Sequence, residues 1–368
     1  MNIAFIYAVG RLQRLESVRA GQSASEFFYG SEELRKAGHD VTLYEVSPND
    51  TKGLGRAIVD FLFSKGLLPN RTRGWVLLGV KKWLAALNRH EVVVATSTGL
   101  AFSLAIWQAL GLLKIPIVAI HCGIFNYQPN WLRRRQIRFL LRRMWSVVFG
   151  EAECPIMRQL FDISAERLQV NHFGVDERFW SPAEKPAGGE PFLLAVGNDS
   201  RRDYALLVKA AAELPARVDI LTRLEVNVPL PSNVRVFHSS WHKEALSDQE
   251  LRELYRKCIA VVVPLVETVQ PSGQSVTLQA MACGRPVVLT RVQGLWSKED
   301  MRDGENVLLV PPGDENALRS AMKSLIDDPS KGVALGTAAR RTVENCFRID
   351  SFAARLGELC RVAVGGAT

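Results

Sequence analysis

Short runs of aliphatic and β-branched residues alternate with longer amphipathic segments along the whole chain. In the first half the runs are residues 3–7, 40–46, 91–97 and 115–121. In the second half they are residues 192–197, 217–222, 234–238, 260–265, 285–290 and 306–310. Strands buried on both faces give such runs, and crossover helices give the amphipathic segments between them. The alternation predicts an α/β protein with parallel sheets.

Two domains are expected in 368 residues, because one hydrophobic core rarely extends over so long a chain. The stretch "SPAEKPAGGEP", residues 181–191, is rich in proline, glycine and charge and is typical of a linker. We therefore expect Rossmann-like domains at residues 1–180 and 181–345. A C-terminal helix, residues 346–368, is expected to pack back towards the N-terminal domain.

The net charge of +8 arises in the first half of the chain. Residues 1–180 hold 23 Lys and Arg against 15 Asp and Glu, whereas residues 181–368 hold 23 of each. Segment 52–89 has eight basic residues and one acid, interleaved with tryptophan and leucine, which favours contact with an anionic membrane or a lipid carrier. Nucleic acid is the competing anion, but no known nucleic-acid-binding motif accompanies the charge. Segment 131–145, with six arginines, is expected to be a core-packed helix with a solvated face.

The chain shows no pattern for export, membrane spanning or metal binding. Residues 1–12 lack a basic leader, and the apolar run 99–113 is too short to span a bilayer, so we expect a cytoplasmic protein, free or peripheral on the inner membrane face. The six cysteines form no Cys-x-x-Cys pair and predict neither a disulfide nor zinc. His238 and His242 lack acidic or cysteine partners, and no Asp-x-Asp occurs. No metal or cofactor is expected.

The stretch "PSGQSVTLQAMACGRPVV", residues 271–288, carries the clearest chemical signal. Ser272, Gly273, Gln274 and Ser275 begin a predicted helix, where unpaired amides and the helix dipole can hold a phosphate. Glycine there lets an anion approach the backbone. Alternatively, the serine is only an N-cap and the glycine only a turn residue.

Five segments in the second half carry a family resemblance. In chain order they are "FGVDERFWSP", "LAVGNDSRRDYALLVKAA", "VVVPL", "SGQSVTLQAMACGRPVV" and "GENVLLVPPGDENALRSAM". This ordered set resembles the nucleotide-sugar glycosyltransferases of the GT-B fold, in particular family 4. "GSEELRKAGHDVTLYE" is similar to the acceptor domain of that family. The resemblance covers most of the chain, is strongest over residues 173–322, and implies two Rossmann-like domains facing across a cleft.

The resemblance assigns roles to matching residues. It implies that residues 272–275 hold the donor diphosphate. Arg202 matches a phosphate-binding lysine of the family, and Asn198 stands where arginine is usual. A guanidinium at 202 could also bind the diphosphate leaving group bidentately as its charge develops.

The glutamate pair of the family is not intact. The second glutamate, which binds the donor ribose in relatives, corresponds to Gln279, and the first corresponds to Pro271. An amide can still hydrogen-bond ribose hydroxyls. Glu267, on the preceding loop, either supplies the missing carboxylate or is an exposed loop acid.

Two first-half positions complete the expected site. His121 ends a predicted strand, where open α/β sheets build their sites. The resemblance suggests that it contacts the donor sugar or phosphate, and the alternative is a satisfied core histidine. Gly21, Gln22 and Ser23 match, weakly, the acceptor loop of the family.

Together these features predict a nucleotide-sugar glycosyltransferase, and the resemblance to family 4 implies that it is retaining and metal-independent. It would transfer a sugar from a nucleotide-sugar donor to a hydroxyl of a glycan or lipid-linked acceptor, in cell-surface polysaccharide, lipopolysaccharide or glycolipid assembly. Two alternatives stay open: a nucleotide-sugar epimerase, and a non-catalytic binding partner in a glycan assembly complex. A nicotinamide enzyme is disfavoured, since no Gly-x-Gly-x-x-Gly follows the first strand of either half.

Overall fold

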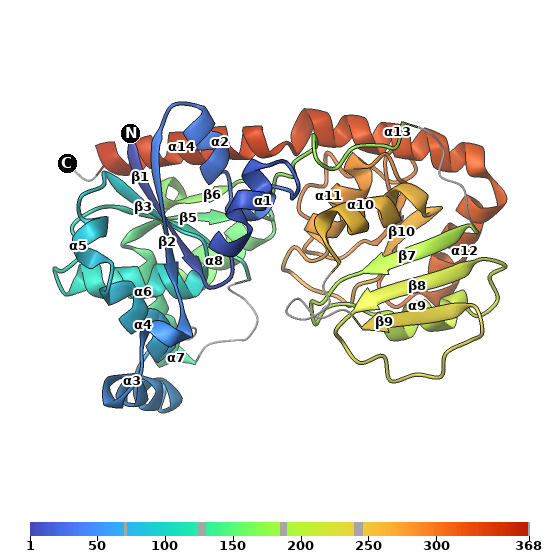
Figure 1. Ribbon diagram of the computed structural model, residues 1–368. Helices are drawn as coiled ribbons and strands as arrows, with labels where there is room; N and C mark the ends of the chain where they lie inside the picture. Colours follow the sequence, from blue (N-terminus) through green and yellow to red (C-terminus); the bar gives the residue numbers. More distant parts are fainter. Residues whose placement is uncertain (70–71, 124–129, 185–189, 239–245, 367–368) are drawn as a thin grey trace. The chain divides into compact units, whose positions relative to one another are not determined.

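The chain folds into two compact α/β units (Figure 1). The computed structural model describes residues 1–69, 72–123, 130–184, 190–238 and 246–366. Unit 1 comprises Met1–Glu16, Phe27–His172 and Asp350–Thr368. Unit 2 comprises Ser17–Glu26 and Phe173–Ile349.

Unit 1 is built on a six-stranded parallel sheet of order β2-β1-β3-β4-β5-β6. Its strands are β1 (Asn2–Ala8), β2 (Asp40–Val46), β3 (Val92–Ala95), β4 (Ile117–Ile120), β5 (Met144–Val148) and β6 (Leu168–Val170). The residues of β3, β4 and β5 are all buried, as the unbroken apolar runs predict.

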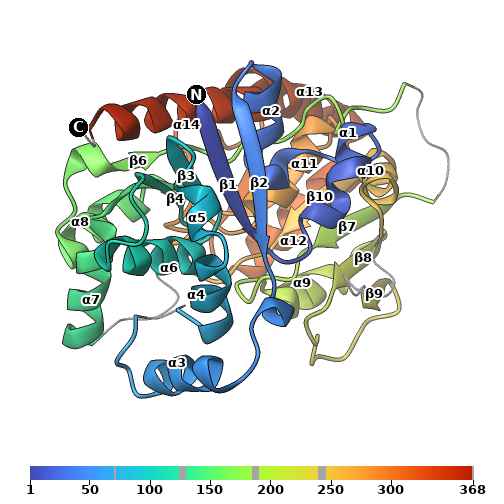
Figure 2. The same ribbon diagram turned by 60° about the vertical axis from the view of Figure 1, so that its left-hand side comes forward.

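Helices α2 to α8 and α14 belong wholly or largely to unit 1, whereas α1 crosses the boundary between the units after Glu16. They are α1 (Leu15–Arg19), α2 (Ser31–Lys36), α3 (Leu54–Ser64), α4 (Gly74–Lys81), α5 (Leu84–Leu87), α6 (Thr98–Ala109), α7 (Trp131–Leu141), α8 (Glu153–Phe161) and α14 (Ile349–Gly365). Figures 1 and 2 both show α14 running beside α2 and the start of β1. The ring of Phe352 in α14 lies 6.2 Å from that of Phe149. In the described ranges no helix combines the length and hydropathy of a membrane span.

Unit 2 repeats the plan with the parallel sheet order β12-β11-β10-β7-β8-β9. Its strands are β7 (Phe192–Val196), β8 (Arg217–Thr222), β9 (Val234–His238), β10 (Ala260–Val263), β11 (Val287–Thr290) and β12 (Leu308–Val310). From β7 the chain first adds β8 and β9 on one side, and it then crosses to the other side of β7 to add β10, β11 and β12. The carboxyl ends of β7 and β10 therefore flank the point where the strand order reverses, which is where open α/β sheets bind ligands.

Five helices surround this sheet. They are α9 (Tyr204–Ala211), α10 (Asp248–Lys257), α11 (Gln274–Ala282), α12 (Glu315–Asp327) and α13 (Pro329–Cys346). One hydrophobic core joins α9 and α12 to the sheet through Leu207, Leu318 and Met322. Helix α11 is buried along most of its length, between β10, β11 and α13.

The two expected α/β units with parallel sheets are confirmed, but the boundaries differ from those in the sequence prediction. The first half of the chain passes into unit 2 at Phe173, before the expected linker. The reason is packing: the Trp180 ring lies 5.7 Å from the Tyr255 ring, and both belong to unit 2. At the other end α13 stays in unit 2, and only the chain from Asp350 onward returns to unit 1.

Candidate functional site

The turn after β7 is fixed by hydrogen bonds to its first residue, Gly197. Its carbonyl accepts from the Tyr204 hydroxyl at 2.8 Å and from the Thr222 hydroxyl at 2.7 Å. These two donors begin α9 and end β8. Gly197 itself has φ +154°, a backbone conformation that favours glycine. The turn therefore leaves β7 in one defined direction.

Arg202 lies in the segment that this turn leads into. Its amide donates to the Asp199 carbonyl at 3.1 Å, and the residue forms an antiparallel bridge with Leu265 after β10. The neighbouring amide of Asp203 donates to the Pro264 carbonyl at 3.0 Å. The backbone around Arg202 is thus tied to the loop that leaves the adjacent strand.

The guanidinium of Arg202 lies between two glycines. A Cβ atom at Gly197 would stand 2.6 Å from Nη2, and one at Gly273 would stand 2.7 Å from Nη1. The Nε and Nη1 atoms are buried, and neither has a hydrogen-bond partner in the part of the chain that the structure describes. Buried donors of a cation without partners carry a free-energy cost that a bound anion would remove.

Helix α11 begins beside this cation. Its N-cap, Gly273, has φ +74°, and no side chain among the described residues caps it. Ser272 does not act as the cap, because its hydroxyl donates to the carboxylate of Asp199. Gln274 is 7% exposed, and its Nε2 lacks a partner among the described residues. The glycine start, the helix dipole and the guanidinium together form an arrangement that can hold an anion.

Gln279, the expected ribose ligand, lies on α11 and is buried. Its Nε2 donates to Oε1 of Glu26 at 2.9 Å, and its Oε1 accepts from the Tyr255 hydroxyl at 3.2 Å. Glu26 also accepts from the indole Nε1 of Trp180 at 2.8 Å. Burial raises the pKa of the Glu26 carboxyl to about 7. Sequence reasoning missed Glu26, because nothing local distinguishes it from other acids in its segment.

The other second-half candidates make their own contacts. Glu267 is exposed, and its Oε1 accepts from the amides of Thr268 at 3.0 Å and Gln293 at 2.8 Å, so it braces its loop. Asn198 Oδ1 accepts from the Arg223 amide at 2.6 Å, which leaves its Nδ2 for a ligand.

His121 lies directly after β4 in unit 1 and is 0% exposed. Its Nδ1 is 3.2 Å from the Thr98 hydroxyl, and its Nε2 is 3.2 Å from the Ser146 hydroxyl. This environment resembles that of a satisfied core histidine, the alternative left open above. A contact between His121 and the donor stays a prediction.

Gly21, Gln22 and Ser23 belong to the short segment that joins unit 2. The amides of Gln22 and Ser23 donate to the Ser17 carbonyl at 2.8 and 3.2 Å, which closes a tight turn. The segment is anchored by the Ala24 amide, which donates to Asp248 at 3.0 Å. The expected loop therefore groups with unit 2, although it was predicted in the N-terminal domain. His242 lies outside the described residues.

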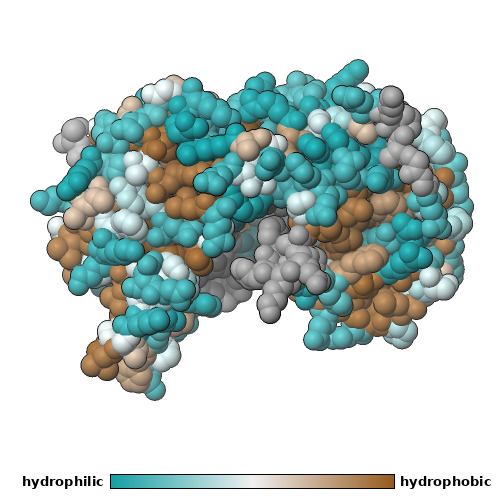
Figure 3. All heavy atoms as spheres, in the orientation of Figure 1, coloured by the Kyte–Doolittle hydropathy of each residue, from teal (hydrophilic) through white to brown (hydrophobic). Residues whose placement is uncertain are grey.

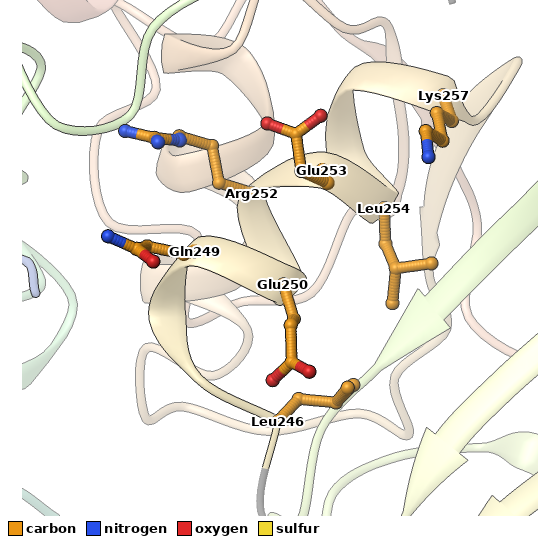
Figure 4. Close-up of a pocket in the computed structure, with 7 residues that line it drawn as sticks. All are labelled: Leu246, Gln249, Glu250, Arg252, Glu253, Leu254 and Lys257. Atoms are coloured by element: carbon orange, nitrogen blue, oxygen red, sulfur yellow. The ribbon is translucent and has the colours of Figure 1, made fainter. Parts of the chain in front are cut away.

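A surface hollow of about 520 Å³ runs along α10. Figure 4 shows that its side chains fan out from the helix and do not converge on one point. The lining residues are Leu246, Gln249, Glu250, Arg252, Glu253, Leu254 and Lys257. None is a predicted site residue, and we assign the hollow no role in the site at α11.

Comparisons with known proteins agree with this geometry. The family model described as glycosyl transferases group 1 matches residues 190–328, which include the whole α11 site. D-inositol 3-phosphate glycosyltransferase 1 of Catenulispora acidiphila is 29% identical over 212 residues, which are 49% of this chain and 48% of that protein. The chain thus spans about half the length of the curated relatives it matches.

Two solved structures cover nearly the whole chain. Sucrose-phosphate synthase from Thermosynechococcus elongatus superposes with a TM-score of 0.72 at 18% identity and covers 100% of both chains. Anabaena HepE in complex with UDP and glucose superposes with a TM-score of 0.68 at 16% identity, covering 97% of this chain and 98% of that one. The fold is therefore that of the GT-B glycosyltransferases.

Proposed function

Because residues 190–328 match the family model described as glycosyl transferases group 1 and the fold is GT-B, we propose that the chain is a nucleotide-sugar glycosyltransferase. It transfers a sugar from a nucleoside-diphosphate sugar to a hydroxyl of a glycan or lipid-linked acceptor. The observation that carries the proposal is the Arg202 guanidinium between Gly197 and Gly273, whose Nε and Nη1 lack hydrogen-bond partners among the described residues, beside a start of α11 that no described side chain caps.

The reaction needs stabilisation of a diphosphate leaving group. As the bond from the anomeric carbon to the phosphate oxygen breaks, its electron pair stays on the diphosphate. Arg202 and the first amides of α11 stabilise this charge, and Ser275 and the Nδ2 of Asn198 add donors. In the retaining, metal-independent form we propose, the acceptor hydroxyl attacks from the face that the diphosphate leaves and passes its proton to it. Glucose from UDP-glucose is the first donor to test, by analogy with the HepE complexes.

Unit 1 carries an exposed apolar stripe that fits a peripheral position on an anionic membrane. Leu54, Ile58 and Phe61 recur at helical spacing on α3 and are all exposed. Figure 3 shows apolar atoms at the tip of unit 1 where Figure 1 draws α3. Lys65 lies 5.5 Å from the Phe61 ring, so a cation accompanies the stripe.

The part of the basic segment 52–89 that forms α4 is largely buried, in contrast to α3. Val76, Leu77 and Val80 of α4 are buried in the core of unit 1, and Trp83 donates its indole N–H to the Glu45 carbonyl at 3.0 Å. Among the described residues of this segment, the exposed large apolar side chains therefore lie on α3 and at Leu67 just after it. Helix α7 buries Ile137 as expected for a core-packed helix, but it also exposes Trp131.

The α3 and α7 surfaces are connected in unit 1. Gln136 of α7 donates to the carbonyl of Leu67, which follows α3 and is exposed, at 3.0 Å. Trp131 on α7 is 74% exposed, and α7 carries four arginines. Aromatic and basic side chains side by side suit the interface of an anionic bilayer, where a lipid-linked acceptor of glycolipid or polysaccharide assembly would lie.

A binding screen tests the donor site. Calorimetry would compare UDP, GDP, ADP and dTDP on the wild-type protein, Arg202→Ala and the control Arg201→Ala. We expect Arg202→Ala to lose about tenfold or more in affinity, and the control about twofold or less. Equal affinity in all three proteins contradicts the assigned role. Sugar interconversion without acceptor would favour an epimerase, and the absence of any nucleotide binding would favour a non-catalytic partner.

A further inference from the structure

The side-chain amide of Gln279 is held at both ends. Glu26 accepts from its Nε2 at 2.9 Å, and Tyr255 donates to its Oε1 at 3.2 Å. Each end can form one more hydrogen bond, because an amide has two N–H donors and two acceptor lone pairs. Gln279 can therefore still offer one N–H and one lone pair to a ligand.

Glu26 is itself fixed in position. The indole of Trp180 donates to the same Oε1 at 2.8 Å, and the Asp176 amide donates to Oε2 at 3.4 Å. The flanking residues are anchored too: the Ala24 amide donates to Asp248 at 3.0 Å, and the Ser25 amide donates to Asp176 at 3.3 Å. The carboxylate thus comes from a segment far away in sequence and has one defined place in unit 2.

Without oriented neighbours, a glutamine amide can rotate by about 180° and exchange its donor and acceptor ends, because the two orientations have almost the same shape. Oε1 of Glu26 accepts from the Trp180 indole as well as from Gln279, and a proton taken up by the carboxyl can lie on Oε2, so Nε2 of the amide faces Glu26. Burial raises the pKa of Tyr255 well above its usual value, so its hydroxyl keeps the proton that it donates to Oε1. Both neighbours therefore select the same orientation of the amide.

We infer that Glu26 is a positioning residue that orients Gln279 for recognition of the donor ribose hydroxyls. The inference rests on the proposed function and deepens it. In relatives a glutamate itself contacts the ribose, as the resemblance implies. In this chain the carboxylate stands behind an amide, and the pair presents a donor and an acceptor together.

The experiment measures how strongly the protein prefers a nucleotide with both ribose hydroxyls over one that lacks a hydroxyl. Affinities for UDP, 2′-deoxy-UDP and 3′-deoxy-UDP are measured for the wild-type protein and for Glu26→Gln. A glutamine at 26 can present either end to Gln279, so both amide orientations become populated. We expect the preference for UDP over the deoxy nucleotides to fall about fivefold, while affinity for the deoxy nucleotides changes less than about twofold.

Two further variants separate positioning from mere structural support. The double variant Glu26→Gln with Gln279→Glu restores a carboxylate–amide pair and is expected to recover most of the preference. Asp248→Asn weakens the anchor of the segment without touching Gln279 and is expected to keep the preference. If Asp248→Asn loses the preference for UDP as much as Glu26→Gln does, the inference that Glu26 positions Gln279 is wrong.

The outcomes separate this inference from the proposed function. If the wild-type protein binds none of UDP, GDP, ADP and dTDP, the proposed function fails and the inference fails with it. If it binds and prefers ribose, and a folded Glu26→Gln keeps that preference, only the inference fails. Should Glu26→Gln not fold, Tyr255→Phe removes the other orienting bond and must lower the preference; an unchanged preference overturns the inference.

Discussion

A Cβ atom at Gly273 would stand 2.7 Å from Nη1 of Arg202, so the lack of a side chain at the start of α11 makes room for the cation. The two residues follow different strands, β10 and β7, and meet where the strand order reverses. The topology of the sheet, and not proximity in sequence, therefore brings these two residues together.

Gly273→Ala is expected to lower nucleoside diphosphate affinity by at least about tenfold. The new Cβ would displace the Arg202 guanidinium and would stand 2.5 Å from Cγ1 of Val263. Left-handed backbone adds a strain of about 1–2 kcal/mol in any non-glycine residue. Gly304→Ala is the matched control, since Gly304 has φ +75° and no heavy atom within 4 Å of its Cβ position. Similar affinity loss in both variants would show that strain alone causes it.

Glu26 should make stability fall as the pH rises. Its pKa is about 7 in the folded protein against an ordinary value of 4.5, so the native state binds the proton more tightly. The free energy of unfolding then decreases between about pH 4.5 and about pH 7, by about 3 kcal/mol for this group. Urea unfolding of the wild-type protein and Glu26→Gln, at about pH 4.5 and about pH 8, measures the difference. Parallel pH profiles of the two proteins contradict the shift; Glu153, whose pKa burial also raises to about 7, is present in both.

His121→Ala tests the histidine of unit 1. The ring is fully buried between two hydroxyls, so its removal leaves a cavity and two polar groups without partners. We expect the free energy of unfolding to fall by about 2–4 kcal/mol. Transfer assays on the folded fraction then address the predicted donor contact. An unchanged kcat would exclude a role for His121 at the sugar.

The apolar stripe of α3 predicts salt-sensitive membrane binding. Ile58→Glu with Phe61→Glu should weaken flotation with anionic vesicles by at least about tenfold, because two exposed apolar anchors are lost. Leu110→Glu is the control, since Leu110 is 63% exposed but lies at the end of α6. Equal flotation of all the proteins, or none for the wild type, contradicts membrane contact through α3.

The sequence predicts the local features of the fold and site well. Unbroken apolar runs are explained by strands buried in parallel sheets, and the glycine at 273 marks the beginning of α11. The local sequence pattern does not reveal which residue each side chain contacts in the folded protein. Glu26 meets Gln279, and Glu267 braces Gln293, only because tertiary packing brings them together. The same holds for segment 52–89, whose parts have similar composition but are exposed in α3 and buried in α4.

The central claim is that the first amides of α11 bind the donor diphosphate beside Arg202. Amide hydrogen exchange measured with and without a saturating nucleoside diphosphate tests it most directly, because a bound phosphate slows exchange of the amides that it contacts. The account predicts slowed exchange at Gln274, Ser275 and Val276 in the wild-type protein, and little slowing in Arg202→Ala at equal nucleotide concentration. Slowed exchange elsewhere in the wild-type protein, with these three amides unchanged, would contradict it.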